Sequence, residues 1–245
     1  MTSQTINTTA LTETSPRTAA RIAGIGYLIV FVLGVFANFV VREGLIDADN
    51  AASTFTNIAD SELLFRAGIV AFLAVFIVDV VIAWALYVLF KNVSKELSLL
   101  TGWFRLVYTV FLGVALIFFL VVLDLVSGAG YLTAFEPGQV NAHVMLMLNA
   151  FNYAWLIGLA GFGIHLMLLG YLMLASGSAP RVLGILLAVA GAAYVFDTVA
   201  NALLSNYSDY ETVFLLIVAV PSVVAELWFA VWLLTRGGAE HEALT

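Results

Sequence analysis

Four ionisable side chains lie deep in the apolar part of the sequence, where they could bind a proton or ligand: Asp79, Arg105, His165 and Glu226. Counted from the nearest loop at about 1.5 Å per residue, Asp79 lies about 18 Å, His165 about 16 Å and Glu226 about 15 Å inside. Arg105 reaches the same level if its helix begins near Lys95. Three or four helices therefore place an ionisable group at one depth, near the middle of a bilayer.

Charged side chains at that depth are costly and normally face a partner or a cavity. Insertion of one at a helix centre costs about 2.5–3.5 kcal/mol. Carboxylates and an imidazole at one level suit a proton relay or a ligand site, and this is our hypothesis for Asp79, His165 and Glu226. The structural alternatives are hydrogen bonds between helices for the acids, a neutral hydrogen-bonded His165, and an Arg105 that extends to the interface.

Small and helix-distorting residues surround two of these groups. Gly158 and Gly161 precede His165 by seven and four residues, so they share its helix face and let another helix approach closely. Pro221 removes one backbone hydrogen bond shortly before Glu226. A kink beside a buried acid is typical of binding sites and also of ordinary membrane packing.

A second polar set lies nearer the other end of the helices. Tyr194, Asp197 and Asn201 form an i, i+3, i+7 stripe on one helix face. We interpret it as a secondary polar stripe that leads toward Glu226. Asn152, which begins the preceding helix on the same side, is interpreted as an interfacial anchor.

Metal and cofactor chemistry has no support in the sequence. The chain has no cysteine, and His143 and His165 are separated by about 33 Å of helix, so they cannot share a metal or haem. Zinc-protease, hydrolase, phosphate-loop and dinucleotide motifs are missing from the sequence. We therefore predict no metal site and no cofactor.

The elements that must position these groups follow from composition. Of 245 residues, 63% are hydrophobic and 10% charged, with a mean hydropathy of +1.06. A soluble domain carries about 25% charged residues, so a soluble fold is excluded. The net charge of −7 argues against nucleic acid as a partner.

Six stretches are long and apolar enough to span a bilayer. They run from Ile22 to Val41, Gly68 to Phe90, Phe104 to Val126, Met145 to Ala175, Val182 to Leu204 and Val213 to Thr235.

The basic residues predict the orientation of this all-α, polytopic six-helix bundle. Arg17, Arg21, Lys91, Lys95, Arg181 and Arg236 fall on one side, against Arg42 and Arg66 on the other. The side rich in Lys and Arg is normally cytoplasmic. We therefore expect a prokaryotic plasma (inner) membrane protein with both termini cytoplasmic. Residues 1–20 should form a disordered tail, residues 21–236 the transmembrane domain and residues 237–245 a second cytoplasmic tail.

Several segments also carry a family resemblance along nearly the whole chain. They include Glu62-Leu-Leu-Phe-Arg66-Ala-Gly68, Phe104-Arg105, His165 with Leu169-Gly170-Tyr171-Leu172, Pro180-Arg181-Val-Leu-Gly184, Tyr194 with Asp197, and Pro221 with Glu226. On these residues the chain resembles the prokaryotic family called domain of unknown function 4386. The resemblance implies a multi-pass bacterial or archaeal membrane protein and brings no activity, substrate or catalytic residue.

Three functions fit these features. The first is a small transporter, channel or ligand-binding bundle that binds a small molecule or ion at the ionisable cluster. The second is an accessory or sensor subunit without catalysis, and the third is an intramembrane enzyme that acts on a lipid or isoprenoid with His165 as base. We expect membrane lipids as partners in each case. Small residues at Gly184, Ala188 and Ala192 favour a homo-oligomer.

Overall fold

The computed structural model describes residues 13–239, which form helices and connecting loops with no strand. Six helical segments are long and apolar enough to cross a membrane, as the sequence predicts. The elements are α1 (Pro16–Val35), η1 (Phe36–Arg42), α2 (Glu43–Leu45), α3 (Ala51–Asp60), α4 (Glu62–Phe90), α5 (Lys95–Val126), η2 (Gly130–Ala134), α6 (Pro137–Ser176), α7 (Arg181–Leu203), η3 (Tyr207–Tyr210) and α8 (Glu211–Thr235). The first membrane segment is α1 continued by η1 and α2, and η1 is a π-helix.

The expected boundary of the first tail is wrong by five residues. Helix α1 begins at Pro16, because Ser15 accepts a hydrogen bond from the Thr18 amide and proline is well suited to the first helical turn. Ala19 and Ala20 are already fully buried. Residues 16–20 therefore belong to the bundle, whereas residues 1–12 and 240–245 lie outside the described residues.

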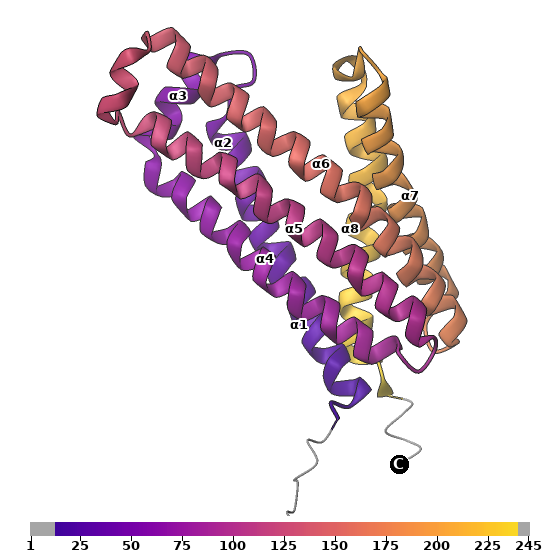
Figure 1. The fold of residues 1–245 in the computed structure, drawn as a ribbon. Coiled ribbons are helices and arrows are strands. Elements are labelled where there is room, and N and C mark those ends of the chain that lie inside the picture. Colours follow the sequence, from indigo (N-terminus) through magenta and orange to yellow (C-terminus); the bar gives the residue numbers. More distant parts are fainter. Residues whose placement is uncertain (1–12, 240–245) are drawn as a thin grey trace, which may run out of the picture.

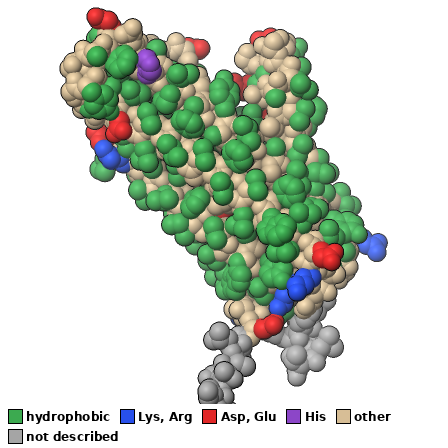
Figure 2. Space-filling view, viewed as in Figure 1, with side chains coloured by type: hydrophobic (Ala, Val, Ile, Leu, Met, Phe, Trp, Pro, Cys, Tyr) green, Lys and Arg blue, Asp and Glu red, His purple; other side chains and the backbone are tan. Residues whose placement is uncertain are grey.

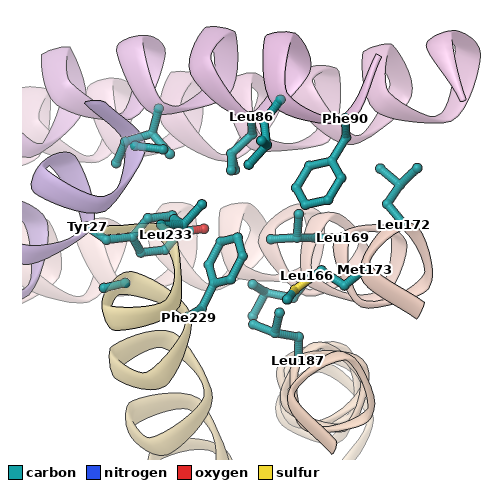
Figure 3. Close-up of a cluster of buried hydrophobic side chains, with 14 of the residues drawn as sticks. Tyr27, Leu86, Phe90, Leu166, Leu169, Leu172, Met173, Leu187, Phe229 and Leu233 are labelled. Atoms are coloured by element: carbon teal, nitrogen blue, oxygen red, sulfur yellow. The ribbon is translucent and has the colours of Figure 1, made fainter. Parts of the chain in front are cut away.

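Both ends of the described chain lie at one end of the bundle, which we call the terminal end (Figure 1). In this half a single apolar core joins side chains from all six long segments. Figure 3 shows part of this core, with α4, α6, α7 and α8 contributing Leu86, Phe90, Leu166, Leu169, Leu172, Met173, Leu187, Phe229 and Leu233 around Tyr27 of α1. The side of the membrane on which this end lies stays a prediction.

The opposite, far end is built differently. Its core draws on η1, α2, α3, α4, α5 and α6, and within the described part of the chain it includes no residue of α7 or α8. Helices α7 and α8 therefore separate from α6 toward the far end (Figure 1). Figure 2 shows the resulting opening between the two arms, which we call the notch.

Glycines let α6 and α7 meet at backbone distance below the notch. A Cβ atom added to Gly163 would lie 2.5 Å from the Gly191 carbonyl oxygen. One added to Gly170 would collide with the Gly184 carbonyl oxygen in the same way. This close contact anchors α7 to α6 near the middle of the bundle, so the separation of the arms begins beyond it.

The terminal end is closed by Arg17, which is 8% exposed. Its guanidinium donates to carbonyl oxygens at the end of α8 and just beyond it: Leu233 (3.3 Å), Leu234 (2.9 Å), Thr235 (3.1 Å) and Gly237 (2.9 Å). A helix C-terminus has unpaired carbonyls and a negative dipole, and a cation satisfies both.

We expect Arg17→Gln to lower the free energy of unfolding by about 1.5–3 kcal/mol, because a charged donor to these carbonyls is lost. Unfolding in mixed detergent micelles measures this change. Arg21→Gln is the matched control: Arg21 is exposed on the same helix, and its replacement should change stability by less than about 0.5 kcal/mol. Equal losses in both variants would contradict the capping role.

Candidate functional site

A buried ion pair between α5 and α4 forms the centre of the site. Arg105 donates from Nε (3.0 Å) and Nη2 (2.5 Å) to the same oxygen, Oδ1, of Asp79. Both side chains are 1% exposed. Because α5 begins at Lys95, Arg105 lies ten residues inside the helix, at the level of Asp79. The alternative in which Arg105 extends to the interface is therefore wrong.

The other terminal nitrogen of Arg105, Nη1, contacts two further helices. It donates to the hydroxyl of Tyr27 on α1 at 2.8 Å and approaches Nε2 of His165 on α6 at 3.2 Å. The guanidinium also lies over the Tyr27 and Phe162 rings, with its carbon 4.7 and 5.4 Å from their centroids. Arg105 thus joins α1, α4, α5 and α6 at one level.

These contacts determine the protonation state of His165. A guanidinium can only donate, so Nε2 of His165 must accept. Its Nδ1 lies 2.9 Å from the Thr101 carbonyl oxygen, which can only accept, so Nδ1 carries the proton. His165 is therefore a neutral histidine with both ring nitrogens engaged, which is the structural alternative described above.

Glu226 on α8 completes the group without joining its hydrogen bonds. Its side chain is half-buried and lies within electrostatic reach of Arg105 and Asp79. The carboxylate has no hydrogen-bond partner among the described residues. The second oxygen of Asp79, Oδ2, is also buried without a partner. The cluster thus contains one cation, Arg105, and two carboxylates with unused acceptor capacity.

The three residues of the secondary stripe on α7 have different surroundings. Tyr194 packs against Phe162, with ring centroids 5.5 Å apart, and is within electrostatic reach of Glu226. One turn farther, Asp197 accepts a hydrogen bond from the Tyr207 hydroxyl at 2.6 Å, and Asn201 is half-buried. The structure therefore brings Tyr194 to the cluster and leaves Asp197 and Asn201 nearer the far end.

Tyr27 is a member of the cluster that the sequence reasoning missed. The sequence predicts a helix that begins at Ile22, which places Tyr27 too close to the helix end. Counted from the true start at Pro16, Tyr27 lies about 16 Å inside, at the depth of the other groups. The signal that could have found it is the Ser15-Pro16 pair, a common helix start.

We expect Tyr27→Phe to lower the free energy of unfolding by about 1–3 kcal/mol, because an Arg105 N–H then stays buried without its acceptor. Detergent-micelle unfolding again measures the loss. Tyr171→Phe is the control, since Tyr171 is 58% exposed and removal of its hydroxyl should have little effect. A Tyr27→Phe variant as stable as the wild type would show that the hydroxyl is dispensable.

The donor set does not resemble a metal centre. Within residues 13–239, no three His, Asp or Glu side chains gather closely enough to hold a metal ion. Arg105 occupies the position between the acid and the histidine, and its charge disfavours a bound cation at that point. The arrangement instead provides a fixed ion pair with an adjacent carboxyl group that can exchange a proton or bind a small cation.

The fold and the cluster together define a polytopic helical membrane protein with a buried ionisable centre. The chain belongs to the family described as Domain of unknown function (DUF4386), whose model matches residues 22–237. It is also 31% identical over 177 residues to an uncharacterized protein of Archaeoglobus fulgidus, covering 72% of this chain and 88% of that one. No solved structure matches this chain.

Proposed function

We propose that this protein is a small transporter in which Glu226 binds a proton or a small cation next to the Arg105–Asp79 pair. The observation that carries the proposal is a half-buried carboxylate that has no hydrogen-bond partner within residues 13–239 and lies beside a fully buried ion pair. Acids inside a membrane segment normally face a partner or a cavity and often belong to a pathway for protons, ions or substrate.

The charge balance favours a cationic ligand. With His165 neutral, ionised Asp79 and Glu226 exceed Arg105 by one negative charge. A low-dielectric site penalises that excess, and a proton or small cation on Glu226 removes it. The remaining members act as a scaffold: Tyr27, His165 and Asp79 hold the guanidinium in place beside Glu226.

In this proposal the ligand reaches the acid from the notch. Asn201, Asp197 and Tyr194 lie at successive turns of α7 from the far end toward the cluster, where Tyr194 is within electrostatic reach of Glu226. Pro221 lies inside α8 one residue before the buried Ser222, whose hydroxyl donates to the Val218 carbonyl oxygen at 2.6 Å. A helix segment that lacks one backbone bond is easier to bend, which suits movement of α8 against the rest of the bundle. With the predicted orientation, the notch faces the outside of the cell.

The engagement of His165 argues against the enzymatic alternative. A general base needs a free nitrogen within reach of substrate, whereas both nitrogens of His165 are occupied by Arg105 and Thr101. No contact among the described residues specifically favours an accessory subunit.

Electrophysiology on solid-supported membranes tests the proposal. Proteoliposomes that contain the purified protein receive concentration jumps of protons, sodium or methylammonium. We expect a transient current in the wild type for at least one of them and its loss in Glu226→Gln. Glu211→Gln, which changes an exposed acid at the start of the same helix, should keep the current. A folded wild type silent for all three ions, or an unchanged current in Glu226→Gln, overturns the proposal.

A further inference from the structure

Arg42, the last residue of the π-helix η1, has an arrangement that topology alone does not explain. Its side chain extends across to α6, where Nη2 donates to Oδ1 of Asn152, while Nη1 donates to Oδ1 of Asn38 at 2.7 Å. The guanidinium carbon lies 5.1 Å from the ring centroid of Phe151 and 5.7 Å from that of Trp155. Asn152, which the sequence predicts to be an interfacial anchor, thus holds this cation.

The charge of Arg42 has no acidic partner. Among the described residues, the ion pairs are those of Arg66 with Glu62, Lys91 with Glu13, and Arg105 with Asp79. Two neutral amide oxygens and two aromatic rings surround Arg42 instead. Its Nε is buried and has no hydrogen-bond partner. Arginine does not lose its proton under such conditions. The neighbouring Glu43 acts on this charge electrostatically but forms no ion pair with it, so the partly enclosed guanidinium has no bonded counter-ion among the described residues.

The π-helix directs this side chain inward. Each residue inserted into a helix rotates the following side chains by roughly 100°, and such insertions often occur at functional sites. The neighbouring Val41 packs on α4, where it would block a Cβ at Gly68. Arg42 reaches α6 instead of extending toward headgroups, as a topological arginine at a helix end would.

Arg42 lies on the wall of the notch. Asn152 precedes His165 by thirteen residues, about 20 Å of helix, so the Arg42 group lies near the far end and well away from the central cluster. Thr198 of α7 donates to the Leu156 carbonyl oxygen at 3.1 Å, one turn from Asn152. Asn152 also precedes Gly163, which meets α7, by eleven residues, about three helical turns, so it shares the face of α6 that turns toward α7 and the notch. The Arg42 guanidinium, bonded to Asn152, lies at this face.

We infer that Arg42, with Asn152, forms an oxyanion-binding subsite in the notch that takes a carboxylate or phosphate group. A guanidinium offers paired donors that match two oxygens of such a group. The side-chain nitrogen of Asn152, next to the oxygen that already accepts from Arg42, is a further donor. That the anion belongs to a transported solute rests on the proposed function above; the binding itself does not.

The same chemistry has two sources, a soluble anion and the phosphate of an anionic lipid. Protein in nanodiscs of pure phosphatidylcholine is titrated with inorganic phosphate or acetate in one arm. Phosphatidylglycerol replaces part of the lipid in the other arm. The readout is the thermal unfolding midpoint, which should rise by about 3–6 °C at tenfold excess over the dissociation constant. A rise with phosphate or acetate indicates a solute site, and a rise confined to phosphatidylglycerol indicates a lipid site.

Substitutions assign the effect to Arg42. Arg42→Gln should abolish the rise in the unfolding midpoint. Arg42→Lys keeps the charge without the paired donors and should retain part of the rise. The lysine variant also keeps the test valid if the glutamine variant does not fold. Arg66→Gln, at an exposed arginine that already pairs with Glu62, should behave as the wild type. Glu226→Gln should also keep the rise, which separates this inference from the transport proposal. No rise in either arm, or an equal rise in Arg42→Gln and Arg42→Lys and the wild type, overturns it.

Discussion

Replacing Asp79 by asparagine lowers the free energy of unfolding by about 3–5 kcal/mol, the usual loss when one partner of a buried ion pair is removed. The substitution keeps the shape of the side chain but leaves the Arg105 charge, which is 1% exposed, without its paired acid. Arginine cannot escape by losing its proton. Equilibrium unfolding of purified protein by sodium dodecyl sulfate in mixed micelles measures the loss.

The reverse substitution should cost less. In Arg105→Met the remaining group is Asp79, and a buried carboxyl can become neutral by taking up a proton. We also expect the double variant Asp79→Leu with Arg105→Met to be more stable than Asp79→Asn, because it leaves no unpaired charge. The losses of stability caused by the single substitutions at Asp79 and at Arg105 are therefore far from additive.

Asp124→Asn is the matched control for this series. Asp124 lies near the end of α5 and is exposed, so its amide variant should change stability by less than about 0.5 kcal/mol. If Asp79→Asn is as stable as this control, then the buried charge of Arg105 does not need Asp79 as its partner, and the ion pair is not the centre of the site.

Replacing Gly163 by alanine should destabilise the protein by about 3 kcal/mol, near the upper end of the range for overpacking. The added Cβ would lie 2.5 Å from the Gly191 carbonyl oxygen and 2.9 Å from Cγ2 of Val195. Backbone atoms cannot move aside like the end of a long side chain, so α6 and α7 must separate. The same micelle unfolding assay measures this change.

Gly34→Ala is the control because nothing lies within 4 Å of the added atom. It should leave stability unchanged or raise it by up to about 1 kcal/mol, the difference in helix propensity. Separation of α6 and α7 should also displace Tyr194 from the central cluster. A stable Gly163→Ala variant would show that this helix contact adapts easily and is not the anchor of the α7–α8 arm.

The sequence alone predicts the six membrane helices well, because apolar length is a strong signal and each helix satisfies its own backbone hydrogen bonds. It also places Asp79, His165 and Glu226 at one depth, since depth depends only on residue counts along each helix. Helix ends are less well determined. The sequence prediction misses the helix start at Pro16 because that start depends on a local cap. It therefore also misses the depth of Tyr27, which is counted from this start.

What lies beside each polar group depends on how the helices rotate and pack, and residue counts do not contain this information. Only the tertiary structure turns Arg105 inward onto Asp79 and directs Arg42 through a π-helix toward Asn152. It also leaves Glu226 without a hydrogen-bond partner in the part of the chain that the structure describes. The notch likewise depends on packing. Glycine contacts join α6 to α7 from the middle of the bundle toward the terminal end, whereas the core of the far end includes no described residue of α7 or α8. Composition and depth follow from a single helix at a time, whereas pairing and access are properties of several helices together.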